Sequence, residues 1–133
     1  MNLAPYVSDF GVPFVIVLVA VLMDMVFGLA CAIVNKEVSS SKMREGIGHK
    51  LAIIGAMVVA MFVEAGCDFI DLGVTVPVVG VTAAYLTLME CWSVCEILVK
   101  MNPDLTNAPI FSLVKSSVDA NEKTVYNSEE QEA

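Results

Sequence analysis

Three long apolar stretches, separated by short polar segments, dominate the pattern of the chain. The first has 23 residues, so as a helix it is about 34 Å long and exceeds the roughly 30 Å hydrocarbon core of a bilayer. The second is the shortest and reaches spanning length only if it continues past Glu64. The predicted spans cover residues 12–34, 51–68 and 74–99. The pattern predicts an all-α membrane protein with three transmembrane helices.

Composition supports a bilayer rather than water as the surrounding medium. Of the 133 residues, 57% are hydrophobic, and the mean hydropathy is +0.76. A small soluble domain buries only about 60 to 70% of its unfolded surface, so apolar side chains at this density would leave large exposed patches. A compact soluble bundle is the alternative, but helices that are apolar all round are typical of membranes or of much larger proteins.

The basic residues predict the orientation of the spans. Residues 1–11 and 65–73 contain no Lys or Arg, whereas Lys100, Lys115 and Lys123 follow the third span. The positive-inside rule therefore predicts an external N-terminus and a cytoplasmic C-terminus. The basic residues between the first two spans are expected to fix topology and to contact lipid head groups. They are Lys36, Lys42, Arg44 and Lys50.

The chain after the third span is predicted to leave the membrane. Asn102-Pro103 ends the helix, and residues 109–115 are expected to form a short interfacial segment. Residues 119–133 carry five acids against Lys123 alone, which predicts a disordered acidic tail. The membrane domain would then comprise residues 1–118.

Acidic residues inside the apolar stretches are the candidate functional residues. Asp24 and Glu90 fall at similar depth, and no Lys, Arg or His occurs within any predicted span. A charged carboxylate facing lipid at the helix centre costs about 2.5 to 3.5 kcal/mol. Protonation, hydrogen bonding to small polar neighbours, or water in an oligomeric lumen would each relieve that cost. Glu64 and Glu96 are further intramembrane candidates.

Small residues recur at helical spacing in each span and predict faces on which helices approach closely. Packing within one bundle and self-association between copies both fit this pattern. Asp24 and Gly28 continue the stripe of the first span, and Glu64 that of the second. The small packing residues are Ala20 and Cys31, then Ala52, Ala56 and Ala60, then Gly80, Ala84, Thr87 and Cys91.

Other classes of function find little support in the sequence. The net charge of −8 argues against nucleic-acid binding, which needs clustered Lys and Arg. The four cysteines do not form a zinc pattern, and there is a single His. No nucleophile stands with a base, so we expect no catalytic residue, no metal and no cofactor.

Together these features resemble the toxin-secretion and phage-lysis holin family over about residues 18–115. The first element is an apolar helix with Asp24-Met25-Val26-Phe27-Gly28. A basic, Ser-rich loop from Asn35 through Gly46 to Lys50 leads into the second helix. A third helix follows with Glu90, Ser93 and Glu96, and then Pro109-Ile110-Phe111.

The resemblance implies a phage-encoded, multi-pass protein of the host bacterial inner membrane. Such a protein forms homo-oligomers and permeabilises the membrane at a timed moment, and a cell-wall hydrolase, the endolysin, then escapes. The endolysin would be only an indirect partner. Two alternatives stay open: a small ion or proton channel or transporter subunit that uses Asp24 and Glu90, and an antiholin that regulates lysis timing.

Overall fold

The computed structural model describes residues 7–70, 73 and 76–132, and these are helical apart from short connections. Three long helices account for most of them: α2 (Val12–Val34), α3 (Ser40–Ile70) and α4 (Val78–Met101). A short π-helix, η1 (Val7–Gly11), precedes α2. A 3-10 helix, η2 (Pro103–Asn107), and a final helix, α5 (Pro109–Glu132), follow α4. The described residues include no strand, so the all-α prediction is confirmed.

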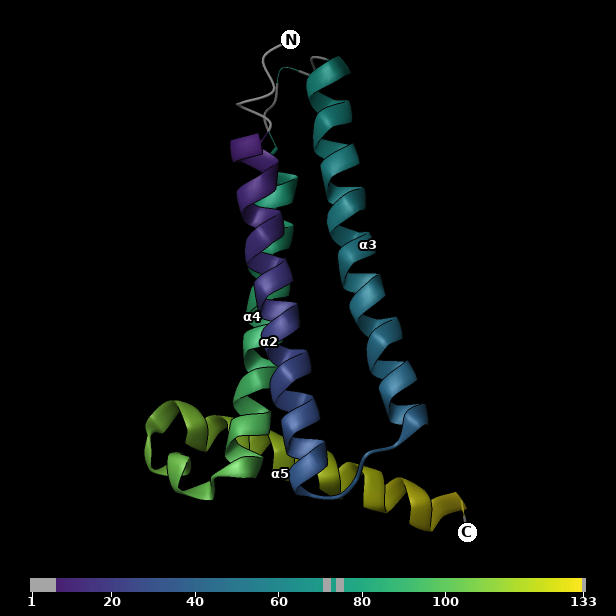
Figure 1. The fold of residues 1–133 in the computed structure, drawn as a ribbon, viewed down its shortest axis with the longest axis vertical. Coiled ribbons are helices and arrows are strands. Elements are labelled where there is room, and N and C mark those ends of the chain that lie inside the picture. Colours follow the sequence, from purple (N-terminus) through teal and green to yellow (C-terminus); the bar gives the residue numbers. More distant parts are fainter. Residues whose placement is uncertain (1–6, 71–72, 74–75, 133) are drawn as a thin grey trace.

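The three long helices run alternately up and down along the long axis of the molecule (Figure 1). Helices α2 and α4 pack side by side, whereas α3 is tilted away from them at the end where it begins (Figure 1). Helix α5 lies across that same end, near the connection between α2 and α3 (Figure 1). All the long connections of the fold are therefore short turns at one end or the other of an elongated bundle.

Local sequence explains where these helices begin and end. Helix α2 has Pro13 in its first turn, where a missing N–H is tolerated. It ends in a Schellman motif, in which the N–H of Glu37 donates to the carbonyl of Ala32 at 3.0 Å. Lys36 occupies the left-handed position of that motif, with φ of 56°. Helix α4 ends at Asn102, whose side chain accepts a hydrogen bond from the N–H of Asp104.

An apolar cluster joins the three long helices in the half of the bundle remote from α5. Its buried members are Phe10, Val17, Val21, Ile53, Met57, Ala60, Val79, Ala83 and Leu86. Most other apolar side chains point outward: Phe62 is 73% exposed and Leu88 is 71% exposed. Such a surface suits hydrocarbon rather than water. Within the described part of the chain, three helices are long and apolar enough to cross a membrane, as predicted.

The boundaries of the second span differ from the prediction. The sequence analysis started this span at residue 51, whereas α3 begins at Ser40 and its membrane-competent part covers Met43–Ile70. Gly46, Gly48 and His49 do not interrupt the helix. Lys50 therefore lies inside the span and not before it.

The C-terminal region also differs from the prediction. Instead of a short segment followed by a disordered tail, the backbone is helical from Pro109 to Glu132. Val114 is buried, and Val118 is half-buried. These two valines anchor the first turns of α5, and the later residues include the helix formers Ala, Glu, Lys and Gln. A helix of this composition continues without an apolar core beneath it.

Candidate functional site

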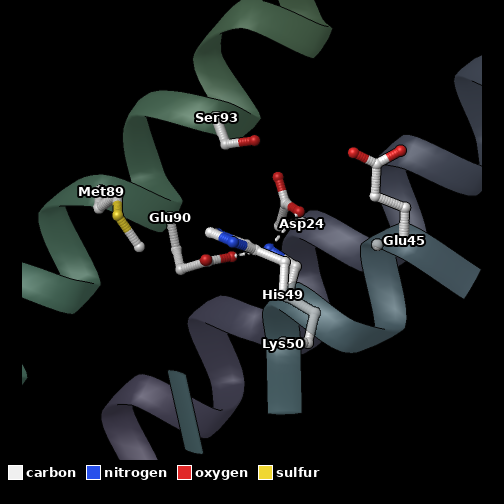
Figure 2. Close-up of a pocket in the computed structure, with 8 residues that line it drawn as sticks. Asp24, Glu45, His49, Lys50, Met89, Glu90 and Ser93 are labelled. Atoms are coloured by element: carbon white, nitrogen blue, oxygen red, sulfur yellow. Dashed lines mark hydrogen bonds and ion pairs between the residues drawn. The ribbon is translucent and has the colours of Figure 1, made fainter. Parts of the chain in front are cut away.

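A buried cluster of three charged side chains connects the three long helices. The Nζ atom of Lys50 on α3 lies 2.6 Å from Oδ2 of Asp24 on α2. The same ammonium donates a hydrogen bond to Oε2 of Glu90 on α4, with which it also forms an ion pair. Asp24 is 8% exposed, Lys50 9% and Glu90 1%. We call Asp24, Lys50 and Glu90 the ion cluster; Figure 2 shows its three side chains converging.

The ion cluster lies near the middle of the bundle. Each member is about ten residues from the end of its helix on the α5 side, namely from Val34, Ser40 or Met101. At 1.5 Å per residue, that distance is roughly 15 Å, or half of a hydrocarbon core about 30 Å thick. Charges at this depth are shielded from lipid only by one another and by the surrounding helices.

The expectation that no cation reaches the two acids is wrong. It rested on the starting point of the second span, which placed Lys50 among the basic residues at the membrane surface. The helical face of α3 that is buried in the bundle begins with Lys50 and continues through Ile53, Met57 and Ala60, at intervals of three and four residues. That spacing is visible in the sequence and is the signal by which Lys50 could have been found.

The electrostatics of the ion cluster make the arrangement demanding. Two carboxylates face one ammonium, so the cluster has one formal negative charge in excess when all three groups are ionised. Removing one partner from a buried ion pair costs about 3 to 5 kcal/mol, because a charge is left unpaired. In addition, Oδ1 of Asp24 is buried without a hydrogen-bond donor. An unpaired buried acceptor costs about 1 to 3 kcal/mol.

An open pocket of about 560 Å³ adjoins the ion cluster. It extends from the ion cluster toward the end of the bundle where α2 ends and α3 begins (Figure 2). Besides the ion cluster, its lining comprises Glu45, Gly46, His49, Met89 and Ser93. Of these, the sequence analysis singled out only Ser93, as part of the family resemblance.

The other two intramembrane acids do not join the ion cluster. Glu64, near the end of α3, accepts a hydrogen bond of 2.7 Å from the backbone N–H of Val79. This N–H belongs to the first turn of α4, so Glu64 caps that helix from a neighbouring one. Glu96 accepts a hydrogen bond of 2.8 Å from Nε1 of Trp92, one turn earlier on α4.

The small-residue stripes are divided between the inside and the outside of the bundle. On α2 the stripe faces inward: Ala20 and Asp24 are buried, and a Cβ at Gly28 would lie 3.7 Å from Ile97. Cys31 and Thr87 are half-buried, and Ala60 is buried. The remaining stripe residues on α3 and α4 are exposed: Ala52, Ala56, Gly80, Ala84 and Cys91. Their predicted role in self-association stays a prediction.

Of the remaining basic residues between the first two spans, Lys36 and Arg44 are exposed near the α5 end of the bundle. The side chain of Lys42 lies outside the described part of the chain. Their contact with lipid head groups also stays a prediction.

The fold defines the chain as a multi-pass α-helical membrane protein with a charged centre. A model of the bacteriophage holin family matches residues 3–109, which is most of the chain, and the protein belongs to that family. The resemblance drawn from the sequence is thereby confirmed. Holins permeabilise membranes and are not known as enzymes. No curated protein and no solved structure gives a significant match to the chain.

Proposed function

We propose that the protein acts as a holin: it self-associates in the inner membrane of a host bacterium and permeabilises it, which releases a phage endolysin and triggers lysis. Family membership supports the class. The observation that carries the mechanism is the ion cluster, because three charges at mid-depth connect all three spans of one chain. No catalytic step is needed for this function.

The ion cluster gives the bundle two acceptable environments for its charges. In the single bundle, Lys50 neutralises most of the charge of Asp24 and Glu90 away from lipid. If the helices separate, the same charges are tolerated only where water reaches them. Helices that repack around a wet lumen would supply that water. Separation into lipid alone would instead leave each charge unpaired at high cost.

The outer surface of the bundle supports association between copies. Ala52 and Ala56 on α3 are exposed at four-residue spacing, as are Gly80 and Ala84 on α4. Small residues at this spacing let the backbones of neighbouring helices approach closely in lipid. We infer that sister copies contact one another through these faces before and during permeabilisation.

The charge distribution supports an external N-terminus and a cytoplasmic C-terminus. Lys36 and Lys100 lie at the end of the bundle occupied by α5, whereas residues 65–73 at the other end contain no Lys or Arg. By the positive-inside rule, the α5 end faces the cytoplasm. The endolysin would then wait on the side of α5.

Inducible expression in a bacterium tests the proposal directly. Cells would express the protein with or without an endolysin that must reach the periplasm, while entry of an impermeant dye and culture turbidity are followed. We expect dye entry in both cultures and lysis only with the endolysin. Cells that stay impermeable to the dye would contradict the proposal. A delay of lysis on co-expression with an established holin would instead identify an antiholin.

One observation favours a second candidate, a small ion or proton channel or transporter subunit. Asp24 and Glu90 are buried at mid-depth beside a pocket that contains two further ionisable side chains, Glu45 and His49. Intramembrane ionisable residues are typical of proton relays. Proton flux into liposomes without leakage of the dye would identify this function and contradict the holin proposal.

A further inference from the structure

The pocket beside the ion cluster has the chemistry of a cation site. Three carboxylates line it, from Asp24, Glu45 and Glu90, against the single ammonium of Lys50. An ionised carboxylate only accepts hydrogen bonds, so the ligand that this lining favours is a donor with positive charge. An anion would meet an excess of negative charge.

A second, independent feature points to a ligand. Asp24 is 8% exposed, and its Oδ2 is engaged by Lys50 while its Oδ1 is buried without any donor. Figure 2 shows one carboxylate oxygen of Asp24 turned away from Lys50, toward the space between Ser93 and Glu45. A buried acceptor left in this state is unfavourable, and an N–H donor in the pocket would relieve it.

Size and lining favour an organic cation. Small-molecule pockets are commonly about 300 to 1,000 Å³, and the volume here is about 560 Å³. Met89 and Gly46 provide apolar surface beside the carboxylates. Among the described residues, no group of three His, Cys, Asp or Glu side chains is arranged to hold a metal ion. A planar amidinium or guanidinium group matches the geometry of carboxylate oxygens.

We propose that this pocket is a binding site for a small organic cation that carries amidinium, guanidinium or primary ammonium N–H donors. One donor group reaches Oδ1 of Asp24, and Glu45 at the pocket mouth provides a second acceptor. The remainder of the ligand lies against Met89. The ligand enters from the α5 end of the bundle, toward which the pocket extends. Binding is a property of the closed bundle and does not depend on permeabilisation.

Calorimetric titration of the full-length protein in detergent tests the site, with benzamidine as the probe and an empty-micelle titration as the blank. Benzamide has the same shape without the charge and serves as the matched control ligand. We expect saturable binding of benzamidine and at least about tenfold weaker binding of benzamide, as for the loss of a charge-assisted hydrogen bond. Equal binding of the two ligands, or no saturation by benzamidine in the millimolar range, would overturn the proposal.

Two variants locate the site. Asp24→Asn should weaken benzamidine binding at least about tenfold, because the acceptor loses its charge. Gly46→Leu leaves every charge in place and should abolish binding by filling the pocket; a Cβ at Gly46 meets no atom within 4 Å, so the side chain can be accommodated. Glu96→Gln, on the same helix as Glu90 but outside the pocket, should bind as the wild type does. Should Asp24→Asn fail to fold, Gly46→Leu decides, and wild-type affinity in that variant would refute the site.

Discussion

Lys50 and Asp24 lie on different helices, and their charged atoms are 2.6 Å apart in the middle of an apolar bundle. Glu90 on a third helix completes the arrangement. Because few polar contacts cross between α2 and α3, this pair fixes the position of α3 against the other two helices. The ion cluster therefore controls both the stability of the closed bundle and the conditions under which it opens.

Replacement of Lys50 tests its contribution to the stability of the bundle. Lys50→Met removes the ammonium and leaves two buried carboxylates without a cation. We expect the free energy of unfolding to fall by about 3 to 5 kcal/mol. Denaturation in detergent, followed by circular dichroism, measures the change. Arg44→Met makes the same change of charge at an exposed position of the same helix and should have little effect. Equal effects of the two substitutions would show that the ion cluster does not stabilise the fold.

Neutralisation of the two acids tests the role of the ion cluster in opening. In the double variant Asp24→Asn, Glu90→Gln, hydration of a lumen lined by these residues becomes less favourable. We expect a delayed onset of dye entry after induction, at equal amounts of protein in the membrane. Glu96→Gln, which removes a charge from α4 outside the ion cluster, should keep the wild-type timing. Unchanged timing and unchanged leakage in the double variant would contradict the mechanism.

The sequence predicts the three spans but not the contacts between them. Apolar length is a property of one segment, so α2 and α4 could be located without any knowledge of their neighbours. The partner of Asp24 could not, because α2 alone does not show which face of α3 it meets. Lys50 was misplaced for a related reason: a charge beside an apolar run looks like the end of a span until the helix before it is known.

The same limit explains the tail and Glu64. Local composition indicates that the residues after 119 are well solvated, but it does not distinguish a solvated helix from disorder, and Val114 lies against a surface that the sequence does not display. Glu64 caps a helix that begins 14 residues later. Its role depends on the turn between α3 and α4, which no periodicity in the sequence encodes.

The contact of Glu64 with α4 makes a separate prediction. Glu64→Ala removes the acceptor for the backbone N–H of Val79 in the first turn of that helix. Loss of a helix cap costs about 0.5 to 2 kcal/mol, so a modest fall in the free energy of unfolding is expected. Asp68→Asn, at an exposed site one turn later on α3, is the matched control and should leave the free energy unchanged. If Glu64→Ala were as stable as Asp68→Asn, the cap would have no energetic role.

Lys36 offers a substitution that should stabilise the protein. Its φ of 56° is left-handed, a conformation that costs a residue with a Cβ about 1 kcal/mol or more and costs glycine almost nothing. Glycine is also the residue that most often occupies this position of a Schellman motif. Lys36→Gly should therefore raise the free energy of unfolding by up to about 1 kcal/mol, since the greater freedom of glycine in the unfolded chain offsets part of the gain. Glu37→Gly, one residue later and without a positive φ, should give no such gain in the same denaturation measurement. A Lys36→Gly variant no more stable than Glu37→Gly would show that the turn between α2 and α3 does not hold the left-handed geometry in the membrane protein.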